Sequence, residues 1–194
     1  DIFQSKELEI SALQGLGSVH AKAAGRMEDQ TIINAIQAAT LPATNVIADG
    51  GTNMTVAKLL QASAALTSKN VDRDDRFLVI TANQEQALLN QEKTTSNLYV
   101  TDRNLMNGRL DNFLGMKIYV IDGREEGGLE ATGNIRSCFL WQMESVGRVY
   151  SMTPTTDIDW SALHQSWLTI ARMRLGATAL LENGIVEIKC DESA

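Results

Sequence analysis

The stretch from Trp167 to Lys189 constrains the fold of this chain more than any other part. It opens with an apolar-rich run and continues through an Asn183-Gly184 dipeptide into residues that alternate between apolar and polar. Asn-Gly is a strong signal for a two-residue hairpin turn, and strict alternation is typical of a half-buried strand. Residues 157–181 alone fit both the helical and the strand period, and the Asn-Gly turn favours the strand. We therefore predict that a pair of β-strands closes the domain.

Length and composition place the chain among ordinary globular proteins. It has 194 residues, of which 44% are hydrophobic and 21% are charged. A chain of this size forms one or two domains and buries roughly two-thirds of its unfolded surface, so it folds without metal or disulfide staples. No apolar run approaches the ~20 residues that cross a bilayer, and no basic-then-apolar leader opens the sequence. We therefore predict no membrane partner and no secretion signal.

The charge of the chain argues against a nucleic-acid binder. The formal net charge is −7, and the 17 basic residues are scattered, with Arg172 and Arg174 nearest to a cluster. Binding to phosphates needs clustered Lys and Arg, because each contact neutralises a negative charge. The sequence therefore predicts no specific nucleic-acid binding.

Two helices are expected in the first part of the chain. Residues 5–39 carry apolar side chains at helical spacing, and a second helix should follow a cap at Thr52 or Asn53. The residues expected along one side of this second helix are Val56, Leu59, Leu60, Ser63, Ala64 and Thr67. Each glycine inside a helix costs up to ~1 kcal/mol relative to alanine, so we expect a kink or break, or close packing, at the glycines of the first helix. These are Gly15, Gly17 and Gly25.

Strand signals dominate the middle of the chain. Residues 76–81 form a short run of strand formers, and the Thr81-Ala-Asn-Gln84 sequence at its end matches a helix capping box. Strands are also predicted at 116–121 and 138–141. The polar intervals 91–112 and 122–133 between them are expected to be functional or mobile loops.

The sequence offers no catalytic, cofactor-binding or metal site. His20 and His164 have no Cys, Asp or Glu at ligand spacing, and motifs for a nucleophilic serine, a phosphate loop or a dinucleotide fold are absent. Cys138 and Cys190 leave two interpretations open, a disulfide or two buried free thiols, and the second is favoured.

The acidic pairs are interpreted as surface residues and the tryptophans as core residues. Adjacent carboxylates diverge, so Asp74-Asp75 and Glu125-Glu126 are expected on a solvated surface. Aromatic residues among apolar neighbours are more often core residues than a ligand platform, although in a self-assembling protein they also anchor interfaces. A core position is therefore predicted for Trp141, Trp160 and Trp167.

Many short motifs in this order resemble the core of the major capsid (coat) proteins of tailed bacteriophages. They begin with helical segments, continue through strand, helix and strand, and end with a Gly-Ala-Thr step and a last strand. These segments are Arg26-Met-Glu-Asp29, Ile32-Ile-Asn-Ala-Ile36, Thr55-Val-Ala-Lys-Leu-Leu60, Ala65-Leu-Thr-Ser-Lys-Asn-Val71, Arg76-Phe-Leu-Val-Ile80, Ala87-Leu-Leu89, Asn107-Gly-Arg-Leu110, Leu114-Gly-Met-Lys-Ile-Tyr-Val120, Gly176-Ala-Thr178 and Gly184-Ile-Val-Glu-Ile188. Together they span most of the chain, from residue 26 to residue 188.

This resemblance implies the Hong Kong 97-type capsid fold, an α+β fold with a long spine helix. Residues 1–45 and 157–194 would form the peripheral domain, with the spine helix and the closing strand pair. Residues 46–156 would form a mixed axial domain. An N-terminal arm and an extended loop precede such a core in the family, and the chain is expected to start after both.

The resemblance also implies a structural protein without enzymatic activity or cofactor. Its copies would form pentamers and hexamers of an icosahedral shell that contains the genome of a phage or prophage. Scaffold, portal or protease proteins would be further partners, the virion capsid the location, and the bacterial cytoplasm the place of assembly. Without arm and loop, the 194-residue chain is expected to fold but to stay a monomer or a small ring at micromolar concentration.

Two other hypotheses remain. The first is an encapsulin-like compartment shell, which shares the capsid fold. The second is an enzyme whose site is assembled from dispersed residues, for which the sequence shows no supporting motif.

Overall fold

A computed structural model describes residues 2–91, 110–121, 123, 128–164 and 166–193. The chain divides into two compact units, and each is described by itself. Unit 1 consists of Asp1–Ile32 and Arg148–Ala177, and unit 2 consists of Ile33–Gly147 and Thr178–Ala194. Most of the predicted loop at 91–112, and residues 122 and 124–127 of the second loop, lie outside the described residues.

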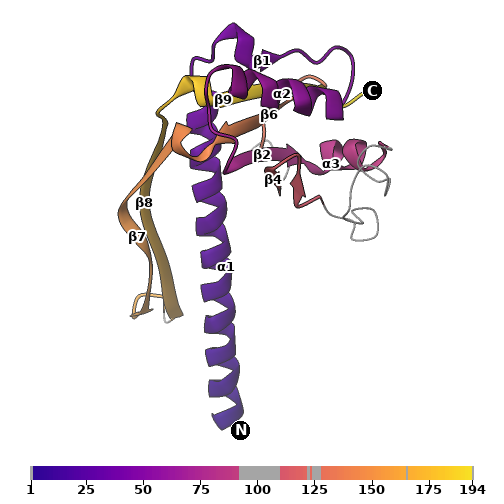
Figure 1. The fold of residues 1–194 in the computed structure, drawn as a ribbon. Coiled ribbons are helices and arrows are strands. Elements are labelled where there is room, and N and C mark those ends of the chain that lie inside the picture. Colours follow the sequence, from indigo (N-terminus) through magenta and orange to yellow (C-terminus); the bar gives the residue numbers. More distant parts are fainter. Residues whose placement is uncertain (1, 92–109, 122, 124–127, 165, 194) are drawn as a thin grey trace. The chain divides into compact units, whose positions relative to one another are not determined.

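Helix α1 (Ile2–Gln37) is one continuous helix of 36 residues (Figure 1). The helix predicted over 5–39 is confirmed, but the break expected at its glycines is wrong. A Cβ added at Gly15, Gly17 or Gly25 would meet no atom within 4 Å, so the described chain does not pack closely there either. The helix continues because good helix formers surround the glycines, such as the Ala-Lys-Ala-Ala sequence before Gly25.

Unit 2 is built on a seven-stranded sheet with the order β1-β9-β6-β2-β4-β3, in which β5 also pairs with β6. The pairs β1 with β9 and β2 with β4 are parallel, and the other pairs are antiparallel. The strands are β1 (Val46–Ile47), β2 (Arg76–Thr81), β3 (Asn112–Phe113), β4 (Met116–Ile121), β5 (Ala131–Thr132), β6 (Ile135–Gln142) and β9 (Ile185–Asp191). Short 3-10 helices precede β1, β7 and β9, namely η1 (Ala43–Asn45), η2 (Met143–Ser145) and η3 (Glu182–Gly184).

The predictions for the middle of the chain are largely confirmed. Strands β2 and β4 have the predicted bounds, and β6 contains the predicted residues 138–141. Helix α3 (Ala82–Leu89) opens with the predicted capping box, in which the Thr81 backbone N–H donates to Gln84 Oε1 at 3.1 Å. These elements depend on neighbouring residues alone, which makes them accessible to sequence analysis.

Helix α2 (Val56–Ser68) begins later than predicted. Its N-cap is Thr55, whose hydroxyl accepts a hydrogen bond from the Lys58 backbone N–H at 3.2 Å, so the predicted caps Thr52 and Asn53 are wrong. The helix buries Val56, Leu59, Ala62 and Leu66 in the core of unit 2, whereas Leu60 and Ala64 are exposed. The prediction of which side of α2 is apolar was therefore only partly correct.

The strands predicted before and after Asn183-Gly184 are confirmed, as β7 (Val146–Ser161), β8 (Ser166–Ala179) and β9, but the hairpin that was predicted to join them is wrong. Asn183 and Gly184 lie in η3, and β9 pairs with β6 and β1 instead of with the preceding strand. The side-chain amide of Asn45 donates to the backbone carbonyls of Glu182, Asn183 and Ile185, at 3.3, 3.2 and 2.7 Å. A Cβ at position 184 would lie 1.8 Å from Ser145 Oγ, so glycine is needed for this close approach and not for a hairpin turn.

Buried cations form hydrogen bonds that connect the loops of unit 2 to its helices and sheet. Lys58 Nζ donates to the backbone carbonyls of Thr52, Asn53 and Lys189 at 2.7, 3.1 and 3.0 Å. Arg76 is only 2% exposed. Its guanidinium donates to the backbone carbonyls of Asp72 and Val71, both at 2.8 Å, and to the hydroxyls of Ser63 and Thr67 at 3.0 and 3.2 Å.

Unit 1 combines most of α1 with a long two-stranded ribbon of β7 (Val146–Ser161) and β8 (Ser166–Ala179), which Figure 1 shows clearly. None of its apolar side chains whose burial the structure describes is fully buried. The carboxylate of Glu28 on α1 accepts hydrogen bonds from Arg148 Nη1 and Tyr150 Oη on β7. Polar contacts therefore contribute much of the attachment of this ribbon to α1.

Candidate assembly surface

The described residues contain no group of three or more His, Cys, Asp or Glu side chains placed to hold a metal ion. His20 is half-buried on α1, and His164 is exposed beyond the end of β7. Asp75 forms an ion pair of 2.8 Å with Lys117, and both side chains are about half exposed. Glu125 and Glu126 lie outside the described residues.

No helix in the described part of the chain is long and apolar enough to cross a membrane.

Cys138 and Cys190 are both free and fully buried, which confirms the favoured interpretation. Cys138 lies opposite Ile188 and Cys190 lies opposite Arg136, so the two thiols are diagonal neighbours on adjacent strands. A hydrogen bond with Cys190 and burial raise the pKa of the Cys138 thiol. A protonated, buried thiol is a poor nucleophile, so the role of Cys138 is packing.

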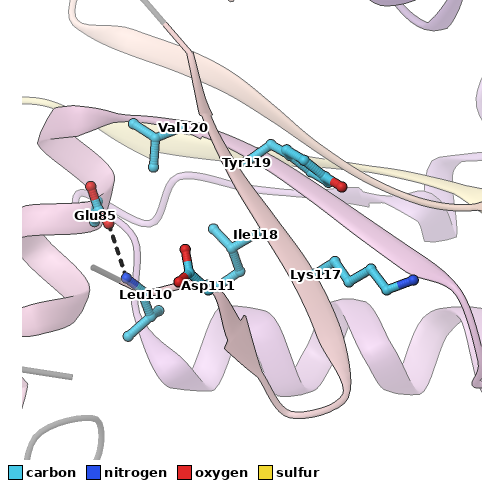
Figure 2. A pocket seen from close by; sticks show the side chains of 7 residues that line it. All are labelled: Glu85, Leu110, Asp111, Lys117, Ile118, Tyr119 and Val120. Atoms are coloured by element: carbon cyan, nitrogen blue, oxygen red, sulfur yellow. Dashed lines mark hydrogen bonds between the residues drawn. The ribbon is translucent and has the colours of Figure 1, made fainter. Parts of the chain in front are cut away.

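An open pocket of about 450 Å³ lies beside β4 (Figure 2). Glu85 at one end accepts a hydrogen bond from the Leu110 backbone N–H at 3.1 Å, and the Lys117 ammonium points away from the pocket's carboxylates (Figure 2). None of the described residues that line it is a Ser, Thr, Cys or His. The lining residues are Glu85, Leu110, Asp111, Lys117, Ile118, Tyr119 and Val120.

Exposed apolar side chains gather near the end of the β7–β8 ribbon. Leu163, in the turn between the strands, is 87% exposed, and the rings of Trp160 and Trp167 meet edge to face with 5.4 Å between their centroids. The tryptophans nevertheless remain about half exposed, at 54% and 50%. We call these exposed side chains the hairpin patch, and it consists of Ile158, Trp160, Leu163 and Trp167.

The predicted core position is therefore wrong for Trp160 and Trp167. A tryptophan is buried only where a second layer covers its strand, and the described part of the ribbon forms a two-stranded sheet of its own. Trp141 on β6 is half-buried beside Phe77, with 6.1 Å between the ring centroids. Sequence reasoning also missed Ile158 and Leu163, although the Asp-Ile-Asp-Trp alternation before the turn was a strand signal.

Comparison with known proteins identifies the family. The model of the phage capsid protein family matches residues 3–192. No curated protein matches the chain in sequence. The evidence for the family therefore comes from the family model and, for the fold, from solved structures.

Solved capsid structures share this fold at low sequence identity. A protein of Mycobacterium phage Che8 is 15% identical with a TM-score of 0.63, and the match covers 91% of this chain and 61% of that one. The capsid of cyanophage P-SCSP1u is 16% identical with a TM-score of 0.63 over 94% of this chain and 65% of that one. The SrpI encapsulin of Synechococcus elongatus PCC 7942 is 7% identical with a TM-score of 0.62 over 94% and 67%.

The chain thus spans less than two thirds of the length of the two phage proteins, at 61% and 65%. What it shares with them is the fold. The family match over 3–192 and these structural likenesses agree with the resemblance noted in the sequence. The chain belongs to the phage capsid protein family and has the Hong Kong 97-type capsid fold.

Proposed function

We propose that this chain is the shell-forming part of the major capsid protein of a tailed phage or prophage. Its copies would associate laterally into pentamers and hexamers of an icosahedral shell that encloses the genome. The observation that carries this proposal is the hairpin patch, in which Leu163 is 87% exposed. Monomeric proteins rarely expose contiguous apolar patches of large size, and an isolated two-stranded ribbon is marginally stable in water. Contact with neighbouring copies would both cover the patch and support the ribbon.

The same proposal assigns a structural role without turnover or cofactor. Most of unit 1 falls in the predicted peripheral ranges 1–45 and 157–194, and most of unit 2 falls in the predicted axial range 46–156. This assignment stays a prediction, as do scaffold, portal or protease partners and assembly in the bacterial cytoplasm. With a net charge of −7, the shell would contain nucleic acid without binding it specifically.

An encapsulin-like compartment shell is the second candidate function. It is supported by the likeness to the SrpI encapsulin, with a TM-score of 0.62. The contents of a purified particle separate the two candidates. A phage capsid would hold DNA, whereas a compartment of this kind would hold protein.

Sedimentation velocity of the purified chain over a concentration series tests the assembly proposal. The unmodified chain should associate weakly at high concentration, and the double variant Trp160→Ser, Leu163→Ser should associate less, because its patch is smaller. Leu181→Ser is the control, since Leu181 is 56% exposed but lies outside the patch. A chain that stays monomeric at every concentration, or a patch variant that associates like the unmodified chain, would contradict the proposal.

A further inference from the structure

The turn between β3 and β4 places a leucine where the backbone disfavours it. Leu114 and Gly115 form a two-residue hairpin loop, with φ of 53° and 75°, between the paired residues Phe113 and Met116. Positive φ at both positions is typical of a type I′ turn, which strongly favours Asn-Gly. The other described residues besides glycine with positive φ are Asn70 and Asp75, which tolerate it. Leucine at position 114 therefore adds backbone strain to the turn, and the turn geometry does not explain its presence.

The side chain of Leu114 is also exposed. It is 45% accessible to solvent and lines an open groove of about 480 Å³ together with the outer side of α2. Leu60 on α2, which is 51% exposed, lines the same groove, and the small Ala64 lies one turn further along the helix. We call this surface the turn groove, and it consists of Leu60, Ala64, Arg73 and Leu114.

The charge of the turn groove is positive. No acidic residue is among the described residues that line it, and its two cations are Arg73 and Arg76. The Arg76 guanidinium is buried and already donates to five protein groups. Arg73 is exposed, so it is the cation that a partner would meet. A complementary segment would therefore present large apolar side chains flanked by carboxylates.

The chain itself contains such a segment. Asp157, Ile158, Asp159 and Trp160 follow one another near the end of β7, and all four are exposed. Side chains alternate between the two faces of a strand, so this edge presents apolar groups on one side and carboxylates on the other. Asp157 Oδ2 lies 4.0 Å from Arg172 Nε in an ion pair that is exposed to solvent. Such a pair is weak, so Arg172 competes little with a partner's cation for the Asp157 carboxylate.

We propose that the turn groove of one copy binds this acidic edge of the hairpin patch of a second copy. The edge of β7 would enter the groove with Ile158 and Trp160 packed against Leu60 and Leu114, and a carboxylate on the opposite face of the strand would pair with Arg73. Such a contact joins two different surfaces, so it propagates from copy to copy, and it forms a ring where the rotation between copies closes. The inference rests on the proposed assembly function and names the surfaces that carry it.

The decisive variant is Leu114→Asn, measured by sedimentation velocity alongside urea unfolding. Asparagine suits the turn, so the free energy of unfolding should be unchanged or higher, while the association constant should fall about tenfold because the apolar contact is lost. Leu181→Asn is the matched control and should leave association unchanged. Association of Leu114→Asn equal to that of the unmodified chain would overturn the proposal.

A charge exchange tests the identity of the partner segment. Arg73→Glu and the double substitution Asp157→Arg, Asp159→Arg should each weaken association, and the chain carrying both sets should regain most of it. Weakening without recovery would show that the two surfaces do not meet, and no weakening would exclude the charge pairing. Either result overturns the inference while association of the unmodified chain leaves the assembly function standing. A chain that never associates would overturn both.

Discussion

Arg76 shows how a single residue can hold several parts of unit 2 in place. It lies at the start of β2, and its contacts reach α2 through Ser63 and Thr67 and the following loop through Val71 and Asp72. Burial lowers the pKa of its guanidinium, but arginine remains charged because its ordinary pKa is so high. An uncharged side chain at this position would leave several acceptors without a donor.

We therefore expect Arg76→Met to lower the free energy of unfolding by about 3 kcal/mol, since buried acceptors lose their partners. Arg73→Met is the control, because Arg73 is exposed and its loss should change stability by no more than about 0.5 kcal/mol. Urea denaturation of both variants measures the difference. Equal stability of the two would show that the hydrogen bonds of Arg76 contribute little.

Glu192 makes the stability of unit 2 depend on pH. Its carboxylate accepts hydrogen bonds from Arg136 at 3.0 and 3.1 Å and from Gln84 at 2.9 Å. The bond from Arg136 lowers the pKa of Glu192 below its ordinary value of 4.5, although burial opposes this. The folded-state pKa is lower than the unfolded one, so this contribution to stability is complete above pH 4.5 and is lost as the pH falls through the folded-state value.

Glu192→Gln should consequently lower stability at pH 7 and flatten the loss of stability on acidification. Urea unfolding at pH 7 and at several acidic values measures both effects. Asp74→Asn is a suitable control, because Asp74 is exposed to solvent. An acid profile of Glu192→Gln parallel to that of the unmodified chain would contradict the assignment.

Among the elements, α1 and η3 show two opposite uses of glycine. Gly25 lies inside α1 with no atom within 4 Å of an added Cβ, whereas Gly184 in η3 faces Ser145. We expect Gly25→Ala to stabilise the chain by about 0.5–1 kcal/mol, because alanine is the better helix former. Gly184→Ala should destabilise it, because the new methyl group would displace Ser145. Thermal unfolding of both variants checks this, and a destabilising Gly25→Ala would reveal a packing partner for α1.

The sequence was informative where structure is decided by near neighbours. The capping box of Thr81 and Gln84, and the runs that form β2 and β4, need no distant residue. The turn at Asn183-Gly184 was misjudged because Asn45, 138 positions away from Asn183, binds its carbonyls. Trp160 was misjudged because burial depends on whether another layer covers the strand. The capsid family was accessible because the order of many short segments is preserved.

The assembly surfaces were harder to predict. Leu60 was placed on the apolar side of α2, yet the structure leaves it in the turn groove. Leu114 was part of a recognised family segment, but only its backbone angle distinguishes it from an ordinary turn residue. The Leu-Gly dipeptide directly before the strand signal at 116–121 was the available clue, since leucine is unusual before glycine in a two-residue hairpin loop.

At the scale of the whole molecule, the two units differ in what holds them together. Unit 2 has a continuous apolar core, and unit 1 has no fully buried apolar side chain among those described. Regions with few buried contacts open at lower free energy than the core. The contacts of Glu28 with Arg148 and Tyr150 should therefore control the opening of the ribbon from α1.

Glu28→Gln weakens these contacts because the amide carries no charge and offers a single acceptor. Backbone hydrogen exchange should become faster over 146–161 and 166–179, while exchange in β2, β6 and β9 stays as slow as before. Glu144→Gln, at an exposed position of unit 2, is the control. Exchange that accelerates equally in both units would show that the two units open as one.

The position of β9 has a consequence for the synthesis of the protein. β9 lies between β1 and β6 in the sheet. Residues near 46 and near 140 can therefore join one sheet only after residues 185–191 have been synthesised. At roughly 5–20 residues per second, a ribosome needs several seconds or more to translate the stretch between β1 and β9. Until β9 has been made, β1 and the edge of β6 that β9 later occupies have no strand partner from their own chain. Many nascent subunits made side by side on one messenger would then be exposed to mispairing, so slower initiation should raise the yield of correctly folded subunits.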